Sequence, residues 1–208
     1  MDIQRSLGTD IIMAFDECPP ANVEKSVVSS AVDRTYAWIK KCKSHLKKSK
    51  PLYSWSQNLF PIVQGGIYPD LRKKSLEQLS SYADCGIAIG GLAVGEDKTA
   101  MFDIIEFMDD YLPKDQPRYL MGVGRPTDLI KAIQRGIDMF DCVMPTRNAR
   151  NGQLFTSDGI INIGNGEYKK SFERIDKKCN CYTCTNFSKA YLRPVSYTHL
   201  TLPTIYSV

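Results

Sequence analysis

A carboxylate stands between an apolar run and a basic run at residues 139–152 of this chain of 208 residues. The apolar run from Ile137 to Met144 is typical of a buried strand. An Asp is tolerated there mainly at a strand end that faces a site, because burying an unpaired carboxylate is costly. Arg147 and Arg150 follow closely, and their planar guanidinium groups suit phosphates or base edges. The pattern predicts a reactive Asp141 beside an anion site, or else a surface ion-pair cluster.

Three cysteines lie close together near the C-terminus, with the spacing Cys179-x-Cys181-x-x-Cys184. The other four cysteines are scattered through expected helices and strands. This usage favours reduced thiols and a metal site over a disulfide framework. A structural zinc ion takes four ligands, and His199 is the one histidine that follows the cluster.

The composition is that of a soluble globular protein, with 43% hydrophobic and 24% charged residues. No apolar run approaches the roughly 20 residues of a spanning helix, and the N-terminus lacks a signal-peptide core, so we expect a cytoplasmic protein without membrane association. Lys and Arg number 15 against 16 Asp and Glu over residues 1–120, but 12 against 7 over residues 121–193. A basic half beside a reactive carboxylate favours nucleic acid as the partner.

Short apolar runs alternate with longer amphipathic ones. The short runs predict strands at Asp10–Phe15, Asn58–Gln64, Gly86–Leu92, Arg118–Val123 and Asp138–Met144. Apolar residues at three-to-four spacing predict helices at Ala21–Lys48, Pro69–Tyr82, Asp97–Tyr111 and Pro126–Arg135. This alternation is typical of a parallel sheet covered by helices.

Polar residues and glycines collect where the predicted strands end. They are Asp16, Gln64 to Gly66, Gly90 and Gly91, Gly122 to Gly124, and Asp141. An α/β barrel builds its active site at this edge, but a closed barrel has eight strands and only five are found. We therefore expect a partial (β/α)8 TIM barrel, in a chain that starts inside the barrel and lacks its first strands.

Six motifs in order resemble those of the bacterial tRNA-guanine transglycosylases, also called queuine tRNA-ribosyltransferases. They are Asp10–Cys18, Val63–Gly66, Gly90–Glu96, Tyr119–Gly124, Met139–Arg147 and Cys179–Cys184. The resemblance runs from about Met1 to Arg193. It implies a partial barrel over residues 1–152, with about its last five strands, and an incomplete zinc-binding subdomain over residues 153–193 that opens with a hairpin at Gln153–Ile163. Residues 194–208 hold no Asp, Glu, Lys or Arg and depart from the family, so we expect a non-native tail and a chain truncated at both ends.

The resemblance also implies an activity. Members of the family exchange guanine at the wobble position of tRNAs with a GUN anticodon for a 7-deazaguanine, in queuosine biosynthesis. Asp141 matches the nucleophile, which forms a covalent Asp–ribose intermediate. The second catalytic aspartate belongs to the missing strands, so we expect this polypeptide alone to have little or no activity.

The remaining roles are carried over position by position. Val94, where the bacterial family has valine, implies 7-aminomethyl-7-deazaguanine as the incoming base. The family also implies a Zn²⁺ ion, whose histidine ligand lies beyond the matched stretch, and a homodimer for the full-length protein. The residues that match are Asp16, Gln64, Gly91, Leu92 and Met121 for the base, Glu96, Arg147 and Arg150 for the RNA, and Cys179, Cys181 and Cys184 for the zinc ion.

Two other functions remain open from the sequence. A zinc-bearing subunit that binds tRNA without catalysis explains the cysteines and the arginines, but leaves Asp141 and the pair of Asp16 and Gln64 without a role. A barrel enzyme acting on a small phosphorylated substrate uses the glycines as a phosphate cradle, but leaves the cysteines and the arginines without one.

Overall fold

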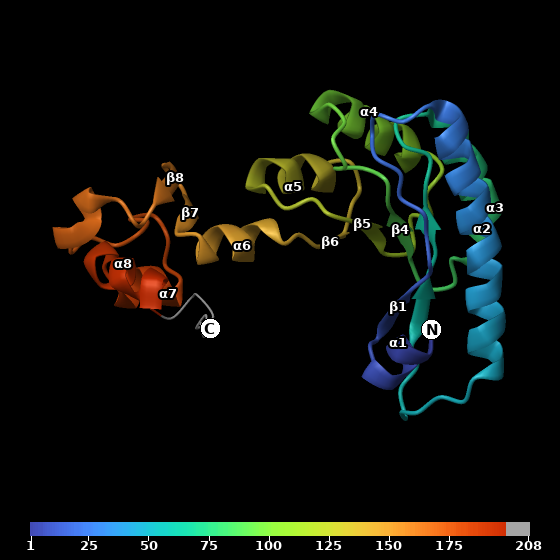
Figure 1. Cartoon of the computed structure of the whole chain (residues 1–208), viewed down its shortest axis with the longest axis horizontal. Coiled ribbons are helices and arrows are strands. Elements are labelled where there is room, and N and C mark those ends of the chain that lie inside the picture. The colour runs from blue at the N-terminus through green and yellow to red at the C-terminus, as the bar shows by residue number, and fades with distance from the viewer. Residues whose placement is uncertain (199–208) are drawn as a thin grey trace, which may run out of the picture. The chain divides into compact units, whose positions relative to one another are not determined.

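The computed structural model describes residues 1–198. The chain forms two compact units, Met1–Cys142 and Val143–Val208, whose elements are labelled in Figure 1. The domain boundary at residue 152 stays a prediction. Among the helices of the described residues, none combines the length and the apolarity that a membrane crossing requires.

The first unit is an α/β structure with parallel strands, as expected. Strand β1 (Ile11–Met13) pairs with β2 (Asn58–Phe60), and a second sheet has the order β3 (Ile62–Val63), β4 (Ile87–Ile89), β5 (Arg118–Leu120) and β6 (Met139–Phe140). The single strand predicted over Asn58–Gln64 is therefore wrong in its middle. Pro61 divides it, because proline has no N–H for a sheet ladder. The Pro61 carbonyl still accepts from Ala88 N (2.9 Å), and the Phe60 carbonyl accepts from Ala14 N (3.0 Å).

Helices connect these strands and begin where the local chemistry predicts. Helix α3 (Pro69–Leu79) and helix α5 (Pro126–Ile133) carry proline in the first turn, where a missing N–H costs nothing. Helix α4 (Lys98–Asp109) is capped by Asp97, whose side chain accepts from Thr99 N (2.8 Å). Helix α2 (Lys25–Lys48) begins four residues later than predicted, and η1 (Ser80–Tyr82) is a 3-10 turn.

A short helix that the sequence did not predict precedes the first strand. Helix α1 (Asp2–Leu7) has no buried residue, so it shows no apolar periodicity. Its Gln4 exchanges two hydrogen bonds with Met13 of β1, at 2.9 Å and 2.8 Å. The sequence pattern predicts no helix before the strand at Asp10–Phe15, and this prediction is wrong.

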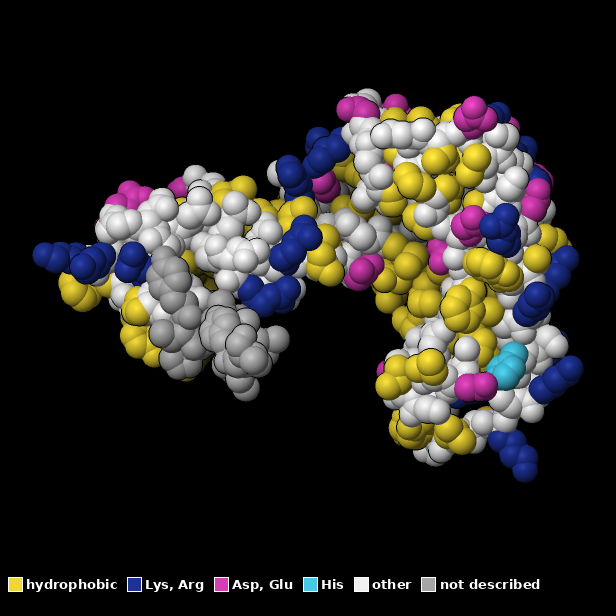
Figure 2. All heavy atoms as spheres, viewed as in Figure 1, with side chains coloured by type: hydrophobic (Ala, Val, Ile, Leu, Met, Phe, Trp, Pro, Cys, Tyr) yellow, Lys and Arg dark blue, Asp and Glu magenta, His cyan; other side chains and the backbone are white. Residues whose placement is uncertain are grey.

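One apolar core joins the strands and helices of the first unit. Its fully buried members include Ile12, Val63, Ile89 and Leu120 from strands, and Ile39, Ile105 and Met108 from helices. Apolar side chains also gather on the surface of this unit (Figure 2), among them Ile3, Leu7, Phe15, Leu52 and Trp55. Contiguous exposed apolar surface of this kind is typical of a contact with further protein.

The second unit begins with helix α6 (Met144–Arg150). The strand predicted to run to Met144 ends at Phe140, and Arg147 and Arg150, for which the sequence predicted no helix, lie on α6. Pro145 explains both errors, because it suits the first turn of a helix and cannot donate to a sheet. The predicted hairpin is confirmed as the antiparallel pair β7 (Gln153–Thr156) and β8 (Gly159–Asn162).

The other helices of the second unit, as far as residue 198, are short. They are η2 (Gly166–Lys170), α7 (Tyr182–Asn186) and α8 (Lys189–Thr198). Helix α8 runs through Pro194, so the tail predicted from residue 194 is helical at its start. The Ser196 hydroxyl donates to the Arg193 carbonyl (2.7 Å) and supports this turn. His199 and the rest of the tail lie outside the described residues.

Ile105 tests the core directly. It is 0% exposed, so Ile105→Ala should lower the free energy of unfolding by about 2–5 kcal/mol through lost burial and a residual cavity. Ile130→Ala is the control, because Ile130 is 59% exposed on α5 and its truncation should change stability by less than about 0.5 kcal/mol. Urea unfolding measures both, and equal effects would contradict this core.

Candidate functional site

The parallel register aligns the ends of four strands. The last paired residues form one row, namely Val63, Ile89, Leu120 and Phe140. The residues that follow them form the next row, namely Gln64, Gly90, Met121 and Asp141. Neighbouring strands lie about 4.8 Å apart, so this row spans about 14 Å of sheet edge. Half-buried Met121 stands inside it, between the two polar ends.

At one end of the row, Asp16 and Gln64 form a hydrogen-bonded pair. Gln64 is 0% exposed, and its Nε2 donates to Asp16 Oδ2 (2.6 Å). Burial raises the pKa of Asp16, and the hydrogen bond from Gln64 opposes part of this shift. Gln64 Oε1 is buried without a hydrogen-bond partner among residues 1–198. A buried acceptor in this state is uncommon in folded proteins and marks this end of the row as a polar site.

Gly91 lies directly against this pair. Its φ of +64° is left-handed, and a Cβ built on it would lie 2.3 Å from Gln64 Oε1, so only glycine fits. The structure therefore brings Asp16, Gln64 and Gly91 together as predicted. Leu92 differs, because its side chain packs in the core at 3% exposure and leaves only its backbone for a ligand.

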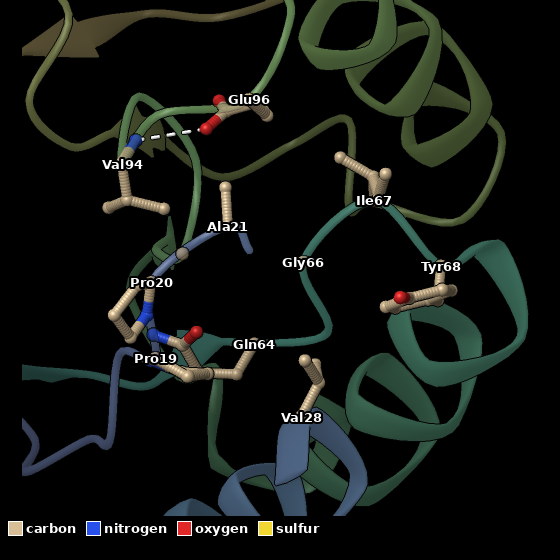
Figure 3. A pocket seen from close by; sticks show the side chains of 11 residues that line it. Pro19, Pro20, Ala21, Val28, Gln64, Gly66, Ile67, Tyr68, Val94 and Glu96 are labelled. Atoms are coloured by element: carbon tan, nitrogen blue, oxygen red, sulfur yellow. Dashed lines mark hydrogen bonds between the residues drawn. The ribbon is translucent and has the colours of Figure 1, made fainter. Parts of the chain in front are cut away.

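The loop after Gly91 is held by Glu96. The Glu96 carboxylate accepts from the backbone N–H of Val94 (2.9 Å) and from that of Ala93, whose φ of +58° is unusual for a residue other than glycine. Gln64, Val94 and Glu96 line a narrow pocket together (Figure 3), which encloses about 10 Å³, the room of one water molecule. In this structure Glu96 orders the loop, and its contact with RNA stays a prediction.

At the other end of the row, Asp141 is exposed and held by two donors. Tyr119 Oη (2.7 Å) and the N–H of Gly122 (3.1 Å) both donate to its Oδ1. Burial raises the pKa of Tyr119, and the hydrogen bond to Asp141 raises it further, so the phenol stays protonated and donates. Among the described residues no donor binds Oδ2, which leaves that oxygen available to react.

Tyr119 is a site residue that the sequence reasoning missed. It lies within β5, and its side chain reaches Asp141 only because β5 pairs with β6. The motif Tyr119–Gly124 was noted for its glycines. The pairing of two neighbouring predicted strands was the signal that could have identified the tyrosine.

The predicted RNA-contacting arginines lie in the second unit. Arg147 and Arg150 are both exposed in the last turn of α6. Residues three apart share a helix face, so the two guanidinium groups lie on the same side of α6. Together they place two positive charges on that side of α6.

The three cysteines of the second unit form one cluster. Their sulfur atoms all lie within 4.8 Å of one another. A tetrahedral ion with metal–sulfur bonds of about 2.3 Å holds its sulfurs about 3.8 Å apart, so small shifts suffice to bind one. The cluster is therefore able to hold a metal ion.

Backbone amides support the same conclusion. The N–H of Cys184 donates to Cys181 and lowers its pKa, which favours the thiolate. Burial raises the pKa of Cys184 to about 11, although the N–H of Asp176 donates to its sulfur. Asp176 is itself fixed by the hairpin turn, since its Oδ2 accepts from both N and Oγ of Ser157 (2.7 Å each). A metal ion must displace the thiol protons as it binds.

The comparison with known proteins decides the family. The family model for queuine tRNA-ribosyltransferase matches residues 1–206. The chain belongs to the queuine tRNA-ribosyltransferase family. The queuine tRNA-ribosyltransferases of Caldanaerobacter subterraneus and Pseudomonas putida are 51% and 48% identical to it over 193 residues each. That of Bacillus subtilis is 50% identical over 194 residues.

The extent of these matches is uneven. They cover 92% to 93% of this chain, but only 49% to 50% of each of the three relatives. The chain thus spans about half the length of the curated queuine tRNA-ribosyltransferases that it matches. The matches therefore show the family of this chain, and the activity of the full-length protein is a separate proposal.

The cysteine cluster gives a prediction for metal binding. The chain should bind one divalent ion. Loss of a residue that only hydrogen-bonds to a metal ligand weakens binding by roughly 10- to 100-fold. Cys184→Ala should weaken binding by more than this, because it removes a ligand. Titration with Co²⁺, whose thiolate complexes absorb visible light, measures the affinity. Cys85→Ala in the first unit should leave it unchanged. Equal affinity of Cys184→Ala and the unaltered chain would contradict the site.

Proposed function

We propose that the full-length protein carrying this sequence is a tRNA-guanine transglycosylase of queuosine biosynthesis. The observation that carries the proposal is the row of strand ends that holds Gln64 at one end and Asp141 at the other, in a chain of this family. A base bound at the Gln64 end presents its sugar toward Asp141. This arrangement suits a reaction at the bond between base and ribose.

Asp141 is the nucleophile in this proposal. Its Oδ2 attacks C1′ of the ribose, the bond from C1′ to guanine N9 breaks, and guanine leaves with the electron pair and takes up a proton. The incoming base then gives up its N9 proton as N9 attacks C1′, which balances the proton that guanine took up, and the Asp141–C1′ bond breaks to restore the carboxylate. Two displacements retain the configuration at C1′. Tyr119 and Gly122 orient the carboxylate through Oδ1.

The groups at the Gln64 end read the base. Asp16 accepts from the guanine N1–H and from the exocyclic amine, while Gln64 and the N–H of Gly91 donate to the carbonyl oxygen. Leu92 contributes backbone, and Met121 covers the ring. A wrong base leaves buried partners unpaired, at about 1–3 kcal/mol each. Val94 favours 7-aminomethyl-7-deazaguanine as the incoming base.

The tRNA partner is proposed from the basic second unit. Arg147 and Arg150 contact the anticodon loop of GUN tRNAs, where unstacked bases are accessible, and Glu96 contacts the same loop. The target nucleotide leaves its stack to reach the site, as in other base-modifying enzymes. The full-length protein acts as a homodimer. The exposed aromatic residues Phe172, Tyr182 and Tyr191 are of the kind enriched at such interfaces.

The ion of the second unit is proposed to be a structural Zn²⁺. Cys179, Cys181 and Cys184 supply three thiolates, and the fourth ligand is a histidine beyond the matched stretch. The parallel strands of the first unit are proposed to be part of a TIM barrel, in which β2 and β3, divided by Pro61, occupy one of five strand positions. Because the chain spans half of its relatives and exposes apolar surface, we propose that it has little or no activity alone.

The role of Asp141 is tested by guanine exchange. In the full-length protein, Asp141→Asn should lower the incorporation of radiolabelled guanine into unmodified tRNA by about a thousandfold or more, because an amide cannot attack C1′. Asp103→Asn, an exposed change on α4, should leave exchange unchanged. If Asp141→Asn keeps both tRNA binding and exchange, the protein does not use this nucleophile. If neither form exchanges guanine and both bind tRNA, the protein is a non-catalytic tRNA-binding subunit.

Asp16 gives a pH dependence with a defined sign. Ionised Asp16 has two acceptor oxygens for the guanine N1–H and amine, whereas protonation converts one of them into a donor, so base affinity is fully present above the pKa of Asp16 and is lost as the pH falls through it. Since burial raises that pKa above the ordinary value of 3.8, the KM for guanine should rise on acidification earlier than for an exposed aspartate. The pH profile of KM measures this. The Asp16→Asn variant should have a high KM for guanine at every pH, without the rise at low pH. If the KM still rises on acidification in this variant, another group causes that rise.

A further inference from the structure

A buried arginine lies behind the base-reading end of the row. Arg72 of α3 is 0% exposed and contacts no carboxylate at ion-pair distance among the described residues, yet its guanidinium is engaged with backbone. Its donors reach four carbonyl oxygens, namely Nε to Gly66 (2.8 Å), Nη1 to Val63 (2.9 Å) and Gly90 (2.7 Å), and Nη2 to Gly91 (3.1 Å). The side chain thus ties α3 to the ends of both β3 and β4.

Three of these carbonyls, those of Gly66, Gly90 and Gly91, lie beyond the last paired residues of β3 and β4, and Gly66 and Gly91 have positive φ. The Val63 carbonyl accepts from Gly90 N (3.0 Å) as well as from Arg72. A buried carbonyl without a partner is costly, and a planar guanidinium offers five donors in a fixed fork. A lysine has a single nitrogen and cannot reach four separate acceptors.

The bonds of Arg72 fix the direction of the groups that read the base. A trans peptide is planar, so its N–H points opposite to its C=O. By holding the Gly90 carbonyl, Arg72 sets the direction of the Gly91 N–H. By holding the Val63 carbonyl, it sets the peptide of Gln64, whose N–H donates to Ser75 Oγ (3.1 Å) on the same helix.

The guanidinium keeps its charge in this position. Burial lowers the pKa of Arg72 to about 9, while Glu96 and Cys18 oppose the shift, so the group is a cation at neutral pH. All its donors are therefore present when the base binds.

A second buried arginine shows what a purely structural role looks like. Arg118 is 5% exposed, pairs with Asp109 and donates to the carbonyls of Pro113 (2.7 Å) and Leu112 (3.0 Å). It is the first residue of β5, so it lies at the opposite end of the strands from the row of Gln64 and Asp141. Both arginines are buried and donate to backbone carbonyls, but Arg118 also pairs with Asp109, and the two order opposite ends of the sheet.

We propose that Arg72 is a positioning residue for base recognition, which orients the Gly91 N–H and the Gln64 peptide from behind the site. The inference rests on the proposed transglycosylase function. It assigns to Arg72 no contact with the base.

The experiment compares Arg72→Lys with Arg118→Lys in the full-length protein. Steady-state guanine exchange gives the KM for guanine, the KM for tRNA and kcat, and thermal unfolding reports folding. Arg72→Lys should raise the KM for guanine by about tenfold or more, the effect of one lost hydrogen bond to the base, and change the KM for tRNA and kcat by less than about threefold. Arg118→Lys should lower thermal stability by a similar amount and leave the KM for guanine unchanged.

The outcomes separate this inference from the function on which it rests. The positioning role is overturned if Arg72→Lys leaves the KM for guanine unchanged, or if Arg118→Lys raises it equally. In both cases guanine exchange by the unaltered protein still upholds the proposed function. If Arg72→Lys fails to fold where Arg118→Lys folds, Arg72 is a stability residue and the inference is wrong. Absence of exchange in the unaltered protein refutes the proposed function itself.

Discussion

Parallel pairing of very short strands is the constraint on which this structure depends. Because parallel strands all end at the same edge, a residue placed just after each strand joins its neighbours without any local contact in the sequence. Gln64 and Asp141 are separated by 77 positions (141 − 64) and still share one row. A slip of one residue in any strand would turn its end group to the other face.

The edge that results is costly to build. Asp16, Gln64 and Arg72 are buried or half-buried polar groups in a region that apolar side chains would pack more easily. Hydrogen bonds to strand-end carbonyls and between Asp16 and Gln64 offset most of that cost. Gln64 Oε1 is one of the buried oxygens in the described residues whose burial no hydrogen bond offsets.

The sequence predicted what depends on local pattern. Apolar runs located the parallel strands, Pro69, Asp97 and Pro126 located helix starts, and cysteine spacing located the cluster. Where one residue changes the local rule, the pattern failed, as at Pro61 and Pro145. Helix α1 escaped because it buries no residue.

The sequence also did not predict side-chain contacts between elements that are distant along the chain. A single arginine in an amphipathic helix is normally solvated, so nothing in the sequence around Arg72 indicates that it faces four carbonyls. Tyr119 likewise gains its role from a strand 20 residues further on. Such roles follow from which elements pair, and periodicity alone does not contain that information.

The most direct test is a crystal structure of the full-length protein with guanine bound. The account predicts the Watson–Crick edge of guanine against Asp16, Gln64 and the Gly91 N–H, and the N9 side directed toward Asp141 Oδ2. Guanine bound away from the strand ends, or an Asp141 carboxylate turned away from N9, would contradict it.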